Sequence, residues 1–487
     1  MIMKSTFVKE QYPYSKADLI RIFGKDDANT CIKKLKEFGV LKTIKKEKRF
    51  SDLSELNDVD LVIVDEEDTE IERYYVFGFV GVIIVNGYVL KCYPKYIFST
   101  QEPFVELMKV ISVLEKYNNS KEQIIKICIN SQHDKEFNRL AAIMYLLNDY
   151  YENGVYNNTQ DIIEVNGNGE INWNKTINET FAILHDNRPY YVELQTLRHK
   201  NNDRDFFKRL HECLLGICST ELKELSLLEL LGLTEVDLTD EILDDFGDKS
   251  YILNQLEKEI NIQFNTRKQS LLKVMYMFIA NEGTLADKSN FSLYGTNAFH
   301  AIWEEACAVA MGNILHKKLR DIKVPSGALS EYYRKRANDE LIDIIEKPTW
   351  FDSQGYDHKA KETLIPDIVS IHEDAFYIFD AKYYNIRLEV GKDVDRQPGV
   401  GDITKQYLYQ LAYKRFCKDH GFATRKVRNS FLMPTEKGDC PMKIGSVRLD
   451  ILSNLKLKNV RVVLLPADMV YDAYLMNQTI NIEDIKL

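Results

Sequence analysis

Two acidic residues and a lysine stand close together in the last third of the chain. Asp367 follows Pro366, Asp380 stands two positions before Lys382, and twelve residues separate the two aspartates. Carboxylate oxygens are ligands that Mg²⁺ prefers, and an ammonium group can balance the negative charge that develops on a reacting phosphate. Residues of these types suit the hydrolysis of a phosphodiester bond with the help of a divalent cation.

This chemistry requires a hairpin that brings the two aspartates together. Apolar and β-branched residues follow Asp367 and precede Asp380, which predicts two strands, and the short polar segment 372–374 allows them to pair antiparallel. Because side chains alternate along a strand, Asp380 and Lys382 share a face while Ala381 points into the packing, with its carbonyl free for a metal. We therefore expect both aspartates at one end of a sheet.

The helices expected on either side of the hairpin carry further candidates. A helix over about 297–318 contains Glu304 and Glu305, of which only one can face the hairpin, and both could be solvated instead. A helix over about 402–416 carries Gln406, which could orient a water molecule or hold a phosphate. Tyr409 and Tyr413 on the same helix have the spacing of core residues.

The composition limits what the chain can bind. A net charge of −10 argues against a surface that is covered by DNA, because non-specific binding depends on Lys and Arg that neutralise phosphates. Contact with nucleic acid must therefore be local. Two basic clusters are candidates for it or for solvated surfaces, namely Lys42, Lys45, Lys46, Lys48 and Arg49, and Lys414, Arg415, Lys418, Arg425, Lys426 and Arg428.

The apolar stretches and the cysteines indicate a reduced, cytoplasmic protein. The longest apolar stretch, 74–85, is shorter than the roughly 20 residues that cross a bilayer, and no signal-peptide pattern opens the chain. The eight cysteines form no C-x-x-C pair. His211, Cys213 and Cys218 lie together, but their segment has the pattern of an amphipathic helix, so we expect burial rather than metal binding.

A chain of 487 residues is expected to form two or three domains. Two short helices and a strand over residues 1–60 predict a winged-helix-like module, which could contact DNA or protein. Asn86-Gly87 predicts a tight hairpin within 74–97, and helices over about 103–116 and 135–151 and a strand pair around Gly167 and Gly169 follow. This gives a β-rich and helical region over 61–245.

The acidic segment 235–248 is the best candidate for a linker, and a solvated helix is the alternative. From about 265 onward the pattern alternates helices and strands, ending in a strand over 460–465, which predicts an α/β domain over 246–487. The whole chain is thus expected to be an α/β or α+β multidomain protein, with a central mixed sheet flanked by helices in its C-terminal domain.

The C-terminal part resembles the PD-(D/E)xK nuclease superfamily, and more narrowly the LlaJI family of restriction endonucleases and the related McrC nuclease subunit. The similar motifs are Leu364-Ile-Pro-Asp-Ile-Val, Phe379-Asp-Ala-Lys-Tyr-Tyr and Phe299-His-Ala-Ile-Trp-Glu. Further segments in the N-terminal half are also similar, namely Phe79-Val-Gly-Val-Ile, Tyr93-Pro-Lys-Tyr and Gly169-Glu-Ile-Asn-Trp-Asn-Lys-Thr-Ile.

The resemblance implies a Mg²⁺-dependent endonuclease that cuts double-stranded DNA in a restriction system, with the N-terminal half as a docking arm. Asp367, Asp380, Ala381 and Glu304 would bind the metal, and Lys382 would position water or stabilise the transition state. The implied partner is a McrB-like AAA+ GTPase, and no G-x-x-x-x-G-K-[ST] phosphate loop occurs in this chain. A homodimer through the nuclease domain is possible, and a silent adaptor of the motor or a DNA-binding regulator are the alternatives.

Overall fold

The computed structural model describes residues 4–45, 73–118, 137–186, 188–201, 205–394, 397–423 and 426–480. Contacts gather the chain into two compact units, one of residues 1–121, 229–232 and 288–487 and the other of residues 122–228 and 233–287. The first and last parts of the chain therefore share a unit. This grouping differs from the division into 1–60, 61–245 and 246–487 expected from the sequence, because strands from distant parts of the chain pair with one another.

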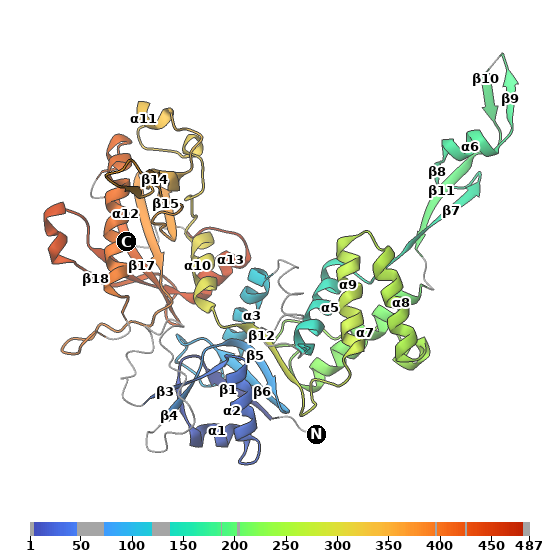
Figure 1. The fold of residues 1–487 in the computed structure, drawn as a ribbon, viewed down its shortest axis with the longest axis horizontal. Helices are drawn as coiled ribbons and strands as arrows, with labels where there is room; N and C mark the ends of the chain where they lie inside the picture. The colour runs from blue at the N-terminus through green and yellow to red at the C-terminus, as the bar shows by residue number, and fades with distance from the viewer. Residues whose placement is uncertain are drawn as a thin grey trace. The chain divides into compact units, whose positions relative to one another are not determined.

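A five-stranded mixed sheet forms the C-terminal part of the first unit (Figure 1). β16, β17 and β19 run parallel, while β15 and β18 are antiparallel to their neighbours at the two edges. In spatial order the strands are β15 (Ile368–His372), β16 (Ala375–Ala381), β17 (Val427–Thr435), β19 (Val460–Pro466) and β18 (Met442–Val447). The central mixed sheet expected from the sequence is confirmed.

Helices pack against this sheet. The long helix α12 (Val400–Asp419) contacts β16, β17 and β19, and Figure 1 shows it beside the strands. Its aromatic residues Tyr409, Tyr413 and Phe416 pack in one buried cluster with Phe376 of β16. α10 (Phe299–Ala310) contacts β16, and α13 (Ala467–Leu475) contacts β19 and α10.

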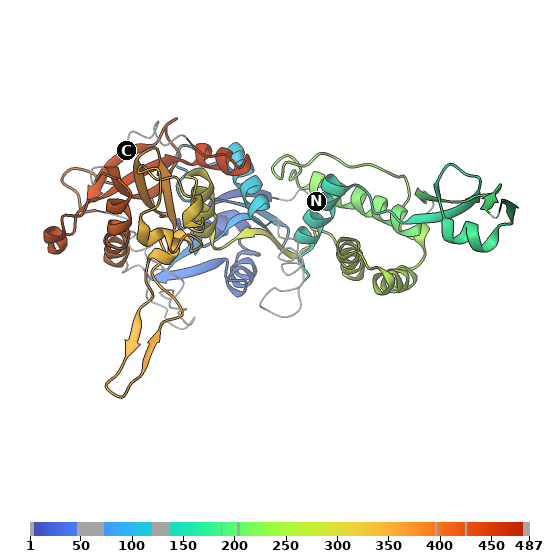
Figure 2. The same ribbon diagram turned by 90° about the horizontal axis from the view of Figure 1, so that it is seen from above.

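The smaller elements of this part are η3 (Leu319–Asp321), α11 (Glu331–Arg334), η4 (Leu341–Ile344), η6 (Asp450–Leu455) and a projecting hairpin of β13 (Thr349–Phe351) and β14 (Asp357–Lys359) (Figure 2).

Two smaller sheets complete the first unit. One has the order β1-β6-β5-β12 and contains β1 (Lys4–Lys9), β6 (Tyr88–Tyr93), β5 (Val80–Val85) and β12 (Phe291–Thr296). The other has the order β2-β4-β3 and contains β2 (Pro13–Ser15), β4 (Arg73–Phe77) and β3 (Leu41–Lys45). The helices are α1 (Lys16–Phe23), α2 (Ala28–Glu37) and α3 (Phe104–Asn118). The two short helices and the strand expected near the N-terminus are present.

Turn chemistry and close approach explain two details of the first of these sheets. Asn86 and Gly87 both have positive φ angles, and they join β5 to β6 as the predicted tight hairpin. Gly81 of β5 stands opposite Gly295 of β12, and a Cβ atom on Gly81 would lie 2.2 Å from the Tyr294 carbonyl oxygen. A side chain at this position would therefore separate the two strands.

The second unit combines a group of helices with a β arm. The helices are α5 (Arg139–Asn153), α7 (Phe206–Glu224), α8 (Lys249–Ile262) and α9 (Thr266–Ala280). β7 (Thr159–Val165) and β11 (Gln195–Asn201) pair antiparallel and lead to β8 (Glu170–Ile171), α6 (Trp173–Glu179), β9 (Ala182–His185) and β10 (Arg188–Tyr191) (Figure 1). The segment 159–201 is called the β arm below.

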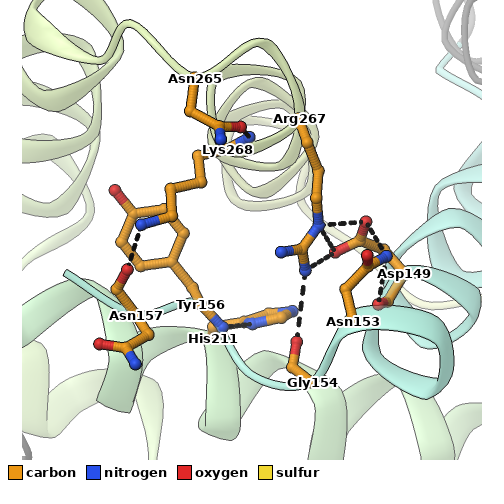
Figure 3. A network of polar contacts seen from close by, with 9 residues as sticks. All are labelled: Asp149, Asn153, Gly154, Tyr156, Asn157, His211, Asn265, Arg267 and Lys268. Carbon is orange, nitrogen blue, oxygen red and sulfur yellow. Dashed lines mark hydrogen bonds and ion pairs between the residues drawn. The ribbon is translucent and has the colours of Figure 1, made fainter. Parts of the chain in front are cut away.

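A polar network joins the helices of the second unit (Figure 3). His211 of α7 is fully buried, and its Nδ1 accepts a hydrogen bond of 2.9 Å from the backbone nitrogen of Tyr156. Arg267 of α9 holds Asp149 of α5 through several hydrogen bonds, the shortest 2.6 Å. Cys213 and Cys218 are also buried, so the burial expected for this segment is confirmed.

The structure also bears on the acidic segment, the basic clusters and the absence of a membrane-spanning stretch expected from the sequence. The acidic segment 235–248 is not a free linker, because it includes the short helix η2 (Leu243–Phe246) and Glu241 forms an ion pair with Arg209 of α7. Lys46, Lys48, Arg49 and Arg425 of the basic clusters lie outside the described residues. In the described part of the chain, none of the helices has the length and apolar character needed to cross a membrane.

Candidate active site

The predicted hairpin forms and places its two aspartates opposite each other. Ile368 pairs with Phe379 in the antiparallel register of β15 and β16, so Asp367, just before β15, faces Asp380. A turn at Glu373 and Asp374 joins the strands, and Glu373 has a positive φ angle. The carboxylate of Asp367 accepts a hydrogen bond of 3.0 Å from the backbone nitrogen of Ala381.

The two aspartates sit in a setting that disfavours two negative charges. Asp380 is 3% exposed and Asp367 is half-buried. Burial raises the pKa of Asp367, and the nearby charge of Asp380 raises it further, to about 8. The carboxyl group of Asp367 therefore keeps its proton more readily than that of an exposed aspartate, and a bound cation would displace this proton.

Lys382 supplies the positive charge of the site. Its Nζ lies 2.6 Å from Asp380 Oδ1 and 3.5 Å from Oδ1 of Asp402, a residue in the first turn of α12. Burial alone would lower the pKa of Lys382, but the carboxylates of Asp380, Asp367 and Asp402 together raise it above its usual value. The ammonium group therefore stays protonated and acts as a fixed cation.

Gln406 of α12 contacts the same aspartate. Its Nε2 donates a hydrogen bond of 3.0 Å to Asp380 Oδ2, and the side chain is fully buried. The Oε1 atom of Gln406 has no hydrogen-bond partner among the described residues. Asn429 of β17 donates to the backbone oxygen of Gln406 and so ties this turn of α12 to the sheet.

The two glutamates of α10 point in different directions. Glu304 is half-buried, and burial raises its pKa. The charge of Lys382 lowers this pKa and the charge of Asp380 raises it. Because both residues belong to the hairpin, the carboxyl group of Glu304 lies near it. Glu305 is exposed, and its charge acts on Tyr474 of α13. Of the two candidates left open by the helix pattern, Glu304 is therefore the one beside the aspartates.

The oxygen atoms gathered here suit a hard cation such as Mg²⁺, since Asp367 and Asp380 face each other and Glu304 is close by. In the part of the chain that the structure describes, however, no three His, Cys, Asp or Glu side chains are close enough together to hold a metal ion. Ala381 is 1% exposed, as expected for a residue that points into the packing. The structure thus brings together two carboxylates, with Glu304 as a neighbour rather than as a third ligand already in place.

Several residues that support the site were not predicted from the sequence. Asn313 donates to the backbone oxygen of Asp367 at 3.1 Å and accepts from the backbone nitrogen of Val369 at 3.1 Å, which fixes the start of β15. The sequence pattern identified Asp402 only as the start of a helix and not as a residue near the site. Asn313 follows Gly312, whose positive φ angle ends α10, and this glycine is the one local signal in the sequence.

A buried link joins the hairpin to the N-terminal part of the same unit. The hydroxyl of Tyr383, the residue after Lys382, donates a hydrogen bond of 2.6 Å to Glu10 Oε2. The backbone nitrogen of Lys95 donates to the same oxygen at 3.2 Å. Burial raises the pKa of Glu10, and Lys95 and Tyr383 lower it in part. No sequence pattern connects residues so far apart.

The tyrosines of α12 have structural roles, as expected. Tyr409 donates to the backbone oxygen of Ile365 at 2.7 Å and so holds the segment before Asp367, while Tyr413 donates to the backbone oxygen of Leu341 at 3.3 Å. Both side chains are buried in the cluster beneath α12.

Comparison with known proteins places the chain in a family. The LlaJI restriction endonuclease family model matches residues 79–326 and 331–468. A curated relative is the type II restriction enzyme BsuMI component YdjA of Bacillus subtilis (strain 168), which is 29% identical over 428 residues, 84% of this chain and 83% of that protein.

Two solved structures with McrB and McrC from Thermococcus gammatolerans are distantly similar. In the refined half-complex of McrB AAA+ hexamers with bound McrC, the matched chain is 12% identical with a TM-score of 0.36, over 97% of this chain and 99% of that chain. In the cryo-EM structure of the McrBC complex, the matched chain is 12% identical with a TM-score of 0.24, over 62% of this chain and 85% of that chain. The family match covers most of the sequence, and this chain belongs to the LlaJI restriction endonuclease family.

Proposed function

We propose that this chain is the Mg²⁺-dependent endodeoxyribonuclease component of a restriction system and that it hydrolyses phosphodiester bonds of double-stranded DNA. The observation that carries the proposal is the hairpin, in which Asp367 and Asp380 oppose each other beside the protonated Lys382. The mixed sheet with α12 and α10 against it agrees with a PD-(D/E)xK nuclease fold, and family membership supports the reaction class.

Each residue has a distinct role in this proposal. Mg²⁺, when bound, would polarise the phosphate and activate a water molecule. Asp367 and Asp380 would hold it, with Glu304 and the Ala381 carbonyl completing the site, once Asp367 has lost its proton. Lys382 would stabilise the negative charge of the transition state. Gln406 would hold Asp380 in place and offer its unpartnered Oε1 to the attacking water.

We further propose that the chain works with a McrB-like AAA+ GTPase, and that two copies can meet through the nuclease domain. Support for a protein partner comes from the β arm in and beside the hairpin of β9 and β10, where large apolar side chains are exposed. Phe181 is 97% exposed, Leu184 72% and Val192 67%. Large apolar side chains that are exposed on one element mark a candidate docking surface.

The second candidate function is a catalytically silent adaptor that binds and stimulates the GTPase. The observation in its favour is that the described residues hold no ready three-carboxylate metal site. In that case the ion pair between Lys382 and Asp380 would be structural, and DNA would be cut by another chain.

Cleavage by the reconstituted complex with and without substitutions at the hairpin separates the two. Asp367→Asn, Asp380→Asn and Lys382→Ala are each expected to lower the cleavage rate at least about 100-fold, while partner binding stays intact, because each removes a metal ligand or the cation. Chelation of Mg²⁺ should have the same effect. The matched control is Glu373→Gln, an exposed acid at the turn of the same hairpin. Cleavage that survives Asp380→Asn would support the adaptor.

A further inference from the structure

A cavity of about 330 Å³ lies on the first unit at the C-terminal half of α12. Its walls come from α12, from residues 421–423 and 427 beyond it, and from the segment 456–458 that leads into β19. None of the residues assigned to the proposed cleavage reaction lines it. Gln406, which contacts Asp380, precedes Lys418 by twelve residues, which is roughly 18 Å along a helix.

Four lysines surround this cavity. Lys414 and Lys418 come from α12, and Lys456 and Lys458 from the opposite wall, and all four are exposed. Their neighbours Arg415 and Lys426 form ion pairs with Asp419 and Asp374. Within the described residues, none of the four cavity lysines forms such a pair with a carboxylate. In a chain with a net charge of −10, this is a concentrated positive potential.

Apart from Gln410, the rest of the lining is apolar. Cys417 and Phe422 are each 4% exposed and form part of the wall together with Val427 and Leu457. An anion-binding surface for phosphate alone has no need of such a wall. The combination of a lysine rim with an apolar wall suits a ligand that has both a charged and a flat apolar part.

The two walls are held together by one buried side chain. Gln410 is 5% exposed; its Nε2 donates to the backbone oxygen of Lys458 at 2.9 Å, and its Oε1 accepts from the backbone nitrogen of Lys458 at 3.0 Å. This pair of hydrogen bonds fixes the lysine-bearing segment against α12. The cavity is therefore formed before any ligand enters, which reduces the entropic cost of binding.

We propose that this cavity binds a nucleotide, with its phosphates among the four lysines and its base against Cys417, Phe422, Val427 and Leu457. The volume falls at the lower end of the range of small-molecule sites, as expected for a single nucleotide. Lysine ammonium groups are common ligands of phosphate. The nucleotide can be free in solution or part of a single DNA strand, and the proposal does not depend on the cleavage reaction.

Calorimetric titration of the purified full-length chain tests the proposal with four probes: ATP, inorganic triphosphate, adenosine and a five-nucleotide strand of deoxyadenosine. ATP or the short strand is expected to bind more tightly than triphosphate or adenosine alone, because only they engage both the lysines and the apolar wall. Tighter binding of ATP assigns the site to a free nucleotide, and tighter binding of the strand assigns it to DNA.

Substitutions connect the binding to this cavity. Lys418→Ala and Lys458→Ala are each expected to weaken binding about threefold to tenfold, as for a partly exposed charge-assisted contact. Lys443→Ala, an exposed lysine on β18 outside the cavity, is the matched control and should leave binding unchanged. Asp380→Asn should also bind ATP normally, so failure of the cleavage proposal leaves this result intact.

Three outcomes would overturn the proposal: no heat of binding for ATP or the strand at millimolar concentration, equal affinity for triphosphate and ATP, or equal weakening by Lys443→Ala. The first leaves the cavity without a ligand of this class. The second leaves the apolar wall without a role, and the third shows only general attraction to a basic surface.

Discussion

Lys382 lies between two carboxylates, and only one of them belongs to the hairpin. Asp380 is fixed by Gln406, whereas Asp402 reaches the ammonium group from α12 at 3.5 Å. In the proposed reaction, Asp402 would be a positioning residue that acts through Lys382. Its charge also helps to raise the pKa of Lys382.

Replacement of Asp402 tests this role. Asp402→Asn is expected to lower kcat for DNA cleavage about threefold to tenfold with little change in KM, because Lys382 loses one of the two charges that orient it. Asp402→Glu should restore most of the rate, which a merely structural role would not predict. Asp419→Asn, an acid at the other end of α12, is the control. Equal losses in both Asn variants would contradict the assignment.

The spacing of residues within one hairpin was enough to predict Asp367, Asp380 and Lys382 as neighbours. The choice between Glu304 and Glu305 was open from the helix pattern, because both side chains could point toward or away from the hairpin. Asp402, Asn313 and Glu10 could not be predicted, since their contacts depend on how separate elements pack. A local pattern carries no information about such contacts.

At the scale of the elements, local sequence patterns predicted where helices and hairpins form better than where a helix ends. The hairpin at Asn86-Gly87 and the helix after the acidic hairpin were predicted close to their observed bounds. The helix expected over about 297–318 ends at Ala310, because Gly312 takes a positive φ angle and Asn313 turns to bind the start of β15. Pairing of β12 with β5 was not predicted, because a strand pairing between residues far apart leaves no local pattern.

His211 offers a test of how α7 packs in the second unit. Burial, aided by Arg267 and opposed by Asp149, lowers the pKa of His211 from 6.5 to about 4. Between these values the unfolded chain binds a proton that the folded unit does not, so the unit loses stability as pH falls from about 6.5 toward 4. The loss is at most about 1.4 kcal/mol per pH unit.

Amide hydrogen exchange of α7 at pH 7 and pH 5, corrected for intrinsic rates, measures this loss. The wild-type chain should lose up to about 2 kcal/mol of protection between these values. His211→Gln, which keeps an acceptor for the Tyr156 backbone nitrogen, should show a smaller loss. The exposed His185→Gln should behave as wild type. An unchanged pH dependence in His211→Gln would show that other groups are responsible.

At the scale of the whole molecule, the chain divides its features between two units. The acidic hairpin and the lysine-lined cavity belong to the first, and the β arm with its exposed apolar side chains belongs to the second. If the chain docks to a partner and cleaves DNA as proposed, the two activities can be impaired independently. The division into units also explains why a linear division of the sequence did not find them: in the sequence, the second lies between residues 1–121 and 288–487 of the first and is interrupted by residues 229–232.

The exposed apolar side chains of the β arm allow this independence to be tested. Phe181→Ser combined with Leu184→Ser should reduce binding to the proposed GTPase partner, and stimulation of its GTP hydrolysis, at least about tenfold, because two anchors of the proposed docking surface are removed. Stability should change by less than about 1 kcal/mol, since both side chains are exposed. Mg²⁺ binding by the isolated chain, followed by calorimetry, should be unaffected.

A matched control is available in the same unit. Phe264, between α8 and α9, is 98% exposed, as much as Phe181 at 97%, but does not lie on the arm. Phe264→Ser should leave partner binding and GTPase stimulation at the wild-type level. If it reduces both as strongly as the arm variant does, general loss of apolar surface is the cause. If the arm variant stimulates normally, the partner docks elsewhere, and the exposed apolar side chains of the arm need another explanation.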